Sequence, residues 1–269
     1  LIGKVNRKLV WIIMKNLTKI TQLFIIQGIL LLIFTFFLTA QEKDIEDFNF
    51  AQKFFLEQNF PIAASEFENF LTKYPSSEKY EDALYFLIKS LKKTNDPDKV
   101  RAYSLMYIRT YKQGLYYPDI AYDYAETELK NKNYSETEII LQDLIKRFPN
   151  DKSVASFYLL LAKNFEVNSD FEKEAEILTA FVNNYPDKGN IPEFLYQLSQ
   201  NRFQLKKMDE YVQYLEKIVK NYYSSKYYDI ALEDLVNYYS SQKNWLKIIE
   251  INSLIKEEEL SNEKKNQLF

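Results

Sequence analysis

The sequence contains no cysteine and no histidine among its 269 residues. Without them the chain can form no disulfide bond and offers no thiol nucleophile. It also lacks the usual zinc and haem ligands and the commonest general base at neutral pH. We therefore expect no metal site, no bound cofactor and no catalysis that depends on Cys or His.

Glycine is also scarce, and the sequence has only Gly3, Gly28, Gly114 and Gly189. A loop that cradles a phosphate on successive backbone amides needs several glycines close together, which these are not. Residues 41–269 hold 38 acidic and 30 basic side chains, a net charge of −8. Nucleic acid and anionic lipid repel such a chain. We expect neither a nucleotide nor a nucleic acid as a partner.

The N-terminal part holds one long hydrophobic run. Lys15 and Lys19 follow Met14 and precede an apolar block, residues 23–38, after which comes the small residue Ala40. A positive head, an apolar body and a small closing residue are typical of a secretory signal peptide. This layout predicts that Met14 is the true start and that the peptide is cleaved after Ala40.

Two interpretations of this segment remain open. In the first, residues 1–13 are an upstream extension, residues 1–40 are removed, and an exported, periplasmic protein begins at Gln41. In the second, residues 20–40 stay as an anchor in the inner membrane, since they are about as long as the ~20 residues that a spanning helix needs. The positive charges on the N-terminal side place the rest of the chain outside the cytoplasm in both. The absence of cysteine excludes a lipoprotein anchor.

The sequence also repeats itself. TKYPSSEKYEDAL at 72–84 recurs as KNYYSSKYYDIAL at 220–232, 148 residues later, which is four times 37. A period of 37 residues holds at other positions along the chain. We call a set of positions spaced 37 residues apart a phase of this period. One phase consists of Phe60, Pro97, Tyr134, Phe171, Met208 and Trp245. Another phase reads Phe50, Leu87, Tyr124, Leu161, Leu198 and Leu235. The period predicts six repeats over about residues 42–260.

Each repeat is predicted to be a pair of helices, A and B. Apolar residues recur three and four apart over two runs of about 14 residues, with a polar turn between them. In the first repeat helix A covers about 44–57 and helix B covers 60–74, where Pro75 ends it. Small residues that let paired helices approach closely are Ala51, Ala63, Ala125 and Ala162. We predict an all-α, right-handed superhelical solenoid over residues 41–260, followed by a tail, 261–269.

The pattern resembles the tetratricopeptide repeat family. The first repeat carries the family residues at family spacing, namely Phe50, Ala51, Phe54, Phe60, Ala63, Phe67, Phe70 and Pro75. The stretch NFPIAASEFENFLTKYPSSEKYEDALYFL is similar to an exported bacterial branch that includes the outer-membrane barrel-assembly lipoprotein and the periplasmic coordinator of the Tol-Pal system. The chain lacks the lipid-bearing cysteine of the first and the N-terminal coiled coil of the second. The resemblance implies a scaffold that binds proteins or peptides in the cell envelope.

In this family the A helices line a concave groove, and one phase of the period is expected to face into it. We call this set the groove phase: Phe48, Tyr85, Tyr122, Leu159, Tyr196 and Glu233. Cations beside it are Lys89, Lys92, Lys93, Lys130 and Lys163. Rings and cations in this order could bind an extended peptide or a partner helix. The alternative is that the rings pack on neighbouring repeats and that the lysines form a solvated face.

Catalysis is not expected. Carboxylates such as Glu126 or Glu166 belong to the charged faces of amphipathic helices, with no cluster of Ser, Lys and Asp around them. The residues after the sixth repeat are too few for a catalytic domain. The sequence therefore predicts a non-catalytic exported adaptor, and alternatively a membrane-anchored structural scaffold that keeps its N-terminal helix.

Overall fold

The computed structural model of the chain describes residues 11, 27–28 and 43–254. The predicted signal peptide with its cleavage site after Ala40, and the predicted tail, 261–269, lie outside these residues. The chain divides into two compact units. The first unit ends at Tyr117 and the second begins at Pro118.

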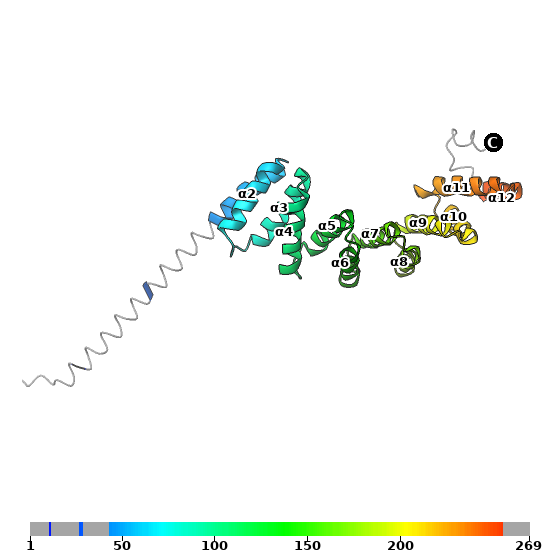
Figure 1. The fold of residues 1–269 in the computed structure, drawn as a ribbon. Coiled ribbons are helices and arrows are strands. Elements are labelled where there is room, and N and C mark those ends of the chain that lie inside the picture. Colours follow the sequence, from blue (N-terminus) through cyan, green and yellow to red (C-terminus); the bar gives the residue numbers. More distant parts are fainter. Residues whose placement is uncertain (1–10, 12–26, 29–42, 255–269) are drawn as a thin grey trace, which may run out of the picture. The chain divides into compact units, whose positions relative to one another are not determined.

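The first unit contains two helix pairs (Figure 1). They are formed by residues 43–56 with α2 (Phe60–Lys73), and by α3 (Tyr80–Thr94) with α4 (Pro97–Thr110). Helix α2 packs on α3, and α3 packs on α4. The first helix A thus ends within one residue of its predicted end.

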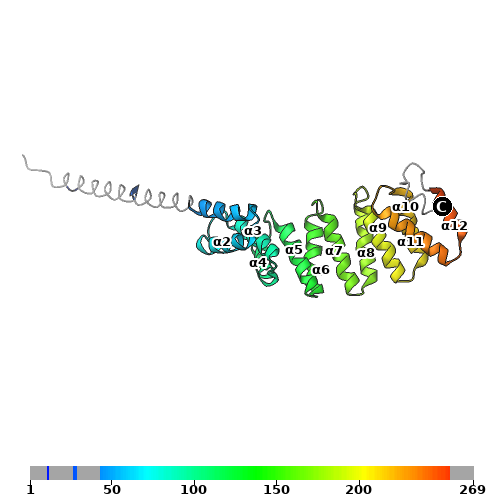
Figure 2. The same ribbon diagram turned by 90° about the horizontal axis from the view of Figure 1, so that it is seen from above.

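The second unit contains four more pairs, whose consecutive helices lie side by side (Figures 1 and 2). The pairs are α5 (Tyr117–Lys130) with α6 (Tyr134–Arg147), α7 (Val154–Val167) with α8 (Phe171–Asn184), α9 (Ile191–Gln204) with α10 (Met208–Asn221), and α11 (Tyr227–Ser241) with α12 (Trp245–Leu254). Residues 43–254 therefore fold into six helix pairs and contain no strand. This confirms the predicted all-α architecture of this part of the chain.

The 37-residue period is visible in the helix starts. Helices α2, α4, α6, α8, α10 and α12 begin 37 residues apart, at Phe60, Pro97, Tyr134, Phe171, Met208 and Trp245. The B helices that are followed by another repeat end at an aromatic residue whose amide N–H donates to the carbonyl four residues earlier. These residues are Tyr74, Tyr111, Phe148, Tyr185 and Tyr222. The predicted end of the first helix B before Pro75 is confirmed.

A left-handed residue lies in the A-to-B turn of each pair. Six residues 37 apart have a backbone φ between 55° and 62°: Gln58, Asn95, Lys132, Ser169, Lys206 and Lys243. This conformation costs an L-residue roughly 1–2 kcal/mol, whereas glycine adopts it freely. None of the six is glycine, so every pair carries this cost. The sequence pattern predicted a polar turn here but not its left-handed backbone.

Replacing Ser169 by glycine is expected to raise the free energy of unfolding by about 0.5–1 kcal/mol. The relief of the left-handed strain exceeds the extra entropy that glycine gives to the unfolded chain. Urea denaturation followed by circular dichroism measures the change. The control Ser169→Ala keeps a Cβ and should bring no gain; an equal gain from both substitutions would contradict this account.

The core lies between successive helices and is filled as the period predicts. The small residues Ala51, Ala63 and Ala125 are fully buried and Ala162 is 4% exposed, as expected of residues between packed helices. In the first unit, Phe67 and Phe70 on α2 are buried against ring neighbours from residues 43–56. The larger side chains thus fill the space that the alanines leave.

Hydrogen bonds from tyrosine to carboxylate connect segments within a helix pair or in successive repeats. In the first unit the Tyr74, Tyr103, Tyr107 and Tyr116 hydroxyls donate to Asp47, Glu68, Glu81 and Asp82. In the second unit the Tyr196 and Tyr227 hydroxyls donate to Asp234 and Glu193. A tyrosine buries its ring in the core while its hydroxyl meets a carboxylate at the edge. Tyr74 and Tyr107 therefore stabilise their own helix pairs, and the other four tyrosines connect one repeat to the next.

None of the helices within the described part of the chain combines the length and the apolar character that crossing a membrane requires.

Candidate functional site

Phe48 is a core residue and does not line an open groove. Its ring is 4% exposed, and its centroid lies 5.8 to 6.2 Å from those of Phe67, Phe70 and Phe86. Because Phe86 comes from α3, the next repeat closes over this position. The prediction that Phe48 offers its ring to a partner is wrong, and the packing alternative holds at this position.

Tyr85, on α3, is partly exposed and also packs within its own unit. Its ring stacks on that of Tyr116, with centroids 4.0 Å apart and planes at 15°. The Tyr116 hydroxyl donates to an Asp82 carboxylate oxygen at 2.8 Å. The Lys89 Nζ atom lies 5.6 Å from the Tyr85 ring centroid. The ring is thus packed against neighbours of its own unit.

The two groove-phase tyrosines of the second unit have the same mixed character. The Tyr122 ring lies 5.9 Å from that of Phe157. The Tyr196 ring lies 5.5 Å from that of Tyr227, and its hydroxyl donates to Asp234 at 3.3 Å. Both tyrosines are partly exposed.

The predicted cations are on the surface. Lys92 and Lys93 on α3 and Lys130 at the end of α5 are exposed, as is the groove-phase residue Glu233 on α11. Lys163 on α7 is exposed too, and it forms an ion pair with Glu166 at 2.8 Å. Of these positions, only Lys163 lines the pocket described next.

A pocket of about 390 Å³ lies between the A helices α7 and α9 of the second unit and reaches down to α8. We call it the α7–α9 pocket, and its lining residues are Leu159, Ala162, Lys163, Glu166, Glu174, Leu178, Glu193 and Gln197. Two of the predicted groove residues, Leu159 and Lys163, therefore line one concave site. Their spacing of four residues puts both on one face of α7.

The lining of the α7–α9 pocket carries three carboxylates and one lysine. Glu174 is 4% exposed, and burial raises its pKa above the ordinary value of 4.5. The nearby Glu166 carboxylate raises this pKa further, while a hydrogen bond from Asn201 at 2.9 Å opposes the rise. The pocket thus has an apolar wall from Leu159 and an acidic floor and rim.

Replacing Glu174 by glutamine is expected to stabilise the protein at neutral pH. A carboxyl whose pKa is raised on folding binds its proton more tightly in the folded state, so its ionisation destabilises the fold as the pH rises above 4.5. Glutamine still accepts the Asn201 hydrogen bond but does not ionise. Thermal unfolding from pH 4 to pH 8 should show an advantage for the variant that grows with pH. Parallel curves would contradict this expectation.

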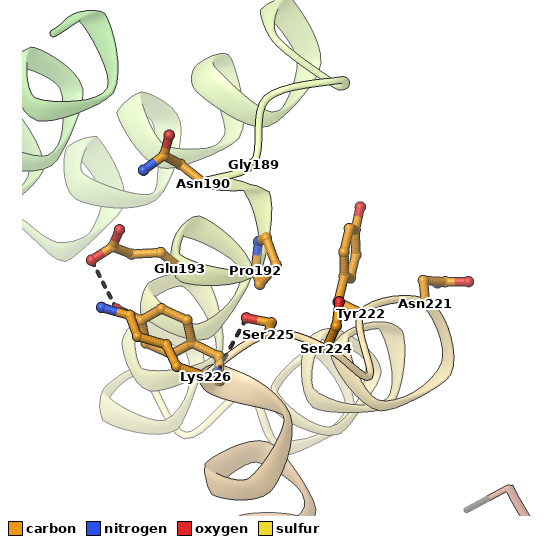
Figure 3. Close-up of a pocket in the computed structure, with 10 residues that line it drawn as sticks. Gly189, Asn190, Pro192, Glu193, Asn221, Tyr222, Ser224, Ser225 and Lys226 are labelled. Atoms are coloured by element: carbon orange, nitrogen blue, oxygen red, sulfur yellow. Dashed lines mark hydrogen bonds between the residues drawn. The ribbon is translucent and has the colours of Figure 1, made fainter. Parts of the chain in front are cut away.

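A second, larger depression of about 490 Å³ adjoins the first at Glu193, and Figure 3 shows it. It lies where α9 and α11 begin, and its lining is Gly189, Asn190, Pro192, Glu193, Asn221, Tyr222, Ser224, Ser225, Lys226 and Tyr227. The Glu193 carboxylate accepts a hydrogen bond of 2.8 Å from the Tyr227 hydroxyl, which fixes its position between the two pockets. Polar side chains and the turn before α11 make up most of this lining.

Four polar lining residues were not predicted as groove residues: Glu166, Glu174, Glu193 and Gln197. Glu174 could have been found from the period, because the same phase in other repeats holds Ala63, Val100, Thr137 and Tyr211, and a lone carboxylate stands out among them. Glu193 and Gln197 are four residues apart on α9, but no sequence signal sets them apart from other solvated residues. Within the described residues, no group of three or more acidic side chains could hold a metal ion.

Comparison with known proteins identifies the type of repeat. A family model described as tetratricopeptide repeat matches residues 193–225, which include most of α9 and α10 and the loop that follows. No curated protein sequence matches the chain. The match confirms the predicted repeat type, and it falls on the pair that borders both pockets.

Solved structures share the fold at low sequence identity. MamA from Desulfovibrio magneticus RS-1, residues 41 to its end, superposes with a TM-score of 0.55 at 15% identity, covering 68% of this chain and 97% of that one. YrrB, described as a TPR protein with an unusual peptide-binding site, superposes with a TM-score of 0.51 at 12% identity, covering 64% and 83%. The fold of the described residues is therefore that of tetratricopeptide repeat solenoids.

Proposed function

We propose that the protein is an exported, non-catalytic adaptor that binds segments of other cell-envelope proteins along its A helices. The observation that carries this proposal is the α7–α9 pocket, where Leu159 and Lys163 of the predicted groove meet in one concave site. The peptide-binding site of YrrB, a protein of the same fold, supports peptide binding as a use of this fold. The exported role follows from the signal-like segment that ends at Ala40.

The chemistry of the pocket indicates which segments it prefers. Leu159 and Leu178 offer apolar contact, and Glu166, Glu174 and Glu193 outnumber the single cation Lys163. Charged groups of opposite sign on two partners steer their association and set specificity. We therefore expect peptides that combine an aliphatic or aromatic side chain with a lysine or arginine to bind best.

Selection of random 12-residue peptides displayed on phage against the full chain tests this function. Enriched peptides should carry more Lys and Arg than the starting library. Leu159→Glu should weaken their binding at least tenfold, because it removes the apolar wall on which the aliphatic or aromatic side chain of the peptide packs, although the added carboxylate by itself would attract a cationic peptide. Fluorescence polarisation with the synthetic peptides measures the change.

A matched control is Gln213→Glu, at an exposed position of α10 outside both pockets. It adds the same charge to the protein and should leave binding within twofold of the parent. The helical circular dichroism signal of both variants should equal that of the parent. Equal binding by Leu159→Glu and the parent would place the peptide site elsewhere on the chain.

This proposal has two forms, which differ in whether the signal-like segment is removed or retained. In the preferred form the signal peptide is removed and the adaptor acts in the periplasm, in the manner of the envelope proteins that the sequence resembles. In the alternative form residues 20–40 stay in the inner membrane, for which their length is sufficient. The intact mass of the protein from an envelope fraction separates them, since the preferred form must begin at Gln41.

A further inference from the structure

Glu174, on α8, is a buried carboxylate without a counter-charge. The residue is 4% exposed, and its Oε2 atom accepts a hydrogen bond of 2.9 Å from the Asn201 side-chain amide. Among the described residues, no group donates a hydrogen bond to its Oε1 atom and no cation forms an ion pair with it. A buried charge in this state is strongly unfavourable. Because Glu174 lines the α7–α9 pocket, a ligand that enters the pocket can reach the carboxylate.

Two cations of the chain act on Glu174 through space, and both are engaged by other carboxylates. The Lys163 Nζ atom pairs with Glu166 at 2.8 Å. The Arg202 Nε atom lies 2.8 Å from a Glu210 carboxylate oxygen. Neither cation is close enough to Glu174 to form an ion pair with it. The place of a direct counter-charge in the pocket is therefore open.

The fold itself does not call for a charge at this position. The counterparts of Glu174 in other repeats carry no charge at neutral pH, and they are buried as it is: Ala63, Val100, Thr137 and Tyr211. The asparagine partner also has a counterpart, since Asn164 lies 37 residues before Asn201 and is 1% exposed. The residue that corresponds there to Glu174 is Thr137. A costly charge that appears in one repeat alone, and at a pocket, indicates a ligand.

The rest of the lining favours a guanidinium group over an ammonium group. A guanidinium is more weakly hydrated, and its planar fork of N–H donors matches a carboxylate. Two further acceptors of the pocket lie on α9, the Gln197 side-chain carbonyl and the Glu193 carboxylate, which the Tyr227 hydroxyl holds in place (Figure 3). Leu159 and Leu178 offer apolar surface to the methylene groups of an arginine.

We propose that Glu174 recognises an arginine side chain of the bound segment, so that the α7–α9 pocket prefers arginine to lysine. This inference deepens the proposed function and rests on it, because the arginine belongs to the peptide that binds in this pocket. The guanidinium supplies the counter-charge that Glu174 lacks. Glu174→Gln should therefore bind arginine peptides less tightly although it is the more stable protein, a combination that a purely structural role of Glu174 would not produce.

Parallel selections of random 12-residue peptides on phage, against the full parent chain and against Glu174→Gln, test the proposal. Relative to the starting library, peptides from the parent should be enriched in arginine at least about threefold more than in lysine. This preference should vanish on Glu174→Gln. The same preference on both proteins, or equal enrichment of arginine and lysine on the parent, would overturn the role of Glu174 and leave peptide binding intact. No enrichment of basic residues on the parent would contradict the proposed function as well.

Fluorescence polarisation with the peptides selected on the parent measures the contact directly. Each arginine is replaced in turn by citrulline, which keeps the shape of the side chain and removes its charge. For one arginine the replacement should weaken binding to the parent at least about tenfold, and it should change binding to Glu174→Gln by less than about threefold. Equal losses on both proteins at every arginine would show that Glu174 does not contact the guanidinium.

The matched control is Glu176→Gln, at an exposed position of the same helix outside the α7–α9 pocket. It removes the same charge from the protein and should leave both the arginine preference and the affinity within about twofold of the parent. Equal weakening by both variants would mean that the net charge of the protein, and not Glu174, attracts the peptides. Thermal unfolding of each variant shows that it is folded.

Discussion

Replacing Phe181 by alanine is expected to lower the free energy of unfolding by about 3–5 kcal/mol, the usual cost of removing a buried ring. The Phe181 side chain is fully buried on α8. Its ring stacks on that of Phe194 from α9 at 3.7 Å, with planes at 10°. The rings of Tyr158 and Tyr185 lie at 5.4 and 5.0 Å. The substitution therefore leaves a cavity where three helices meet.

The loss should be local at first. The stability of stacked repeats is close to a sum of contributions from each repeat and its neighbours. Hydrogen exchange should consequently accelerate most in α8 and α9, and thermal unfolding should broaden. The control is Phe203→Ala, whose side chain is 47% exposed, and it should cost less than about 1 kcal/mol. Similar losses from both variants would mean that the ring cluster at Phe181 is not a core.

The period made the helices predictable. Each phase, such as that of Leu87 and Leu161, has six members along the chain. One atypical residue therefore does not prevent the identification of a mostly buried phase. The small residues at close contacts, Ala63 among them, were placed from the same register and are buried as expected. Helix ends followed from Pro75 and from the aromatic residue before it.

The candidate site was predictable only in part. Leu159 was assigned from its phase and Lys163 as a cation beside that phase, and both line the α7–α9 pocket. Phe48 has the same phase as Leu159 yet is buried, because the bulky Phe86 of the next repeat covers it. A period tells which side of a helix a residue occupies. The size of the neighbouring side chain decides whether that side is open, and this varies from repeat to repeat.

The left-handed turns were missed for a different reason. Glycine or asparagine usually marks such a position, and among the six only Asn95 does. The chain uses lysine, serine and glutamine there instead, so propensity gives no signal. The backbone is set by the two helices that the turn joins, and the strain is offset by their packing.

Gly114, in the loop between α4 and α5, lies against a cluster of polar groups in the first unit. The Tyr107 hydroxyl donates to a Glu81 carboxylate oxygen at 2.5 Å and accepts from the Tyr116 amide at 3.1 Å. The same carboxylate oxygen accepts from the Leu115 amide at 3.0 Å. Tyr107 is fully buried, so each of these groups depends on the others for its hydrogen bonds.

A Cβ atom at residue 114 would collide with the Glu81 carboxylate and the Tyr107 hydroxyl, and it would lie 2.9 Å from the Tyr111 Cβ. The equivalent residues of other repeats are Ser77, Asp151, Lys188 and Ser225, so the turn itself accepts a side chain. Glycine is thus needed because of the polar cluster and not because of the backbone. No φ in the left-handed region is involved, since no glycine of the described chain has one.

Gly114→Ala is therefore expected to lower the free energy of unfolding by about 2–4 kcal/mol, through overpacking and the loss of buried hydrogen bonds. Gly189→Ala is the matched control, because its added Cβ would meet nothing within 4 Å, and it should stay within about 0.5 kcal/mol of the parent. Urea denaturation measures both. Tyr107→Phe removes one of the colliding atoms, so combining it with Gly114→Ala should cost clearly less than the sum of the single changes. Strict additivity, or equal costs at the two glycines, would show that the collision is not the cause.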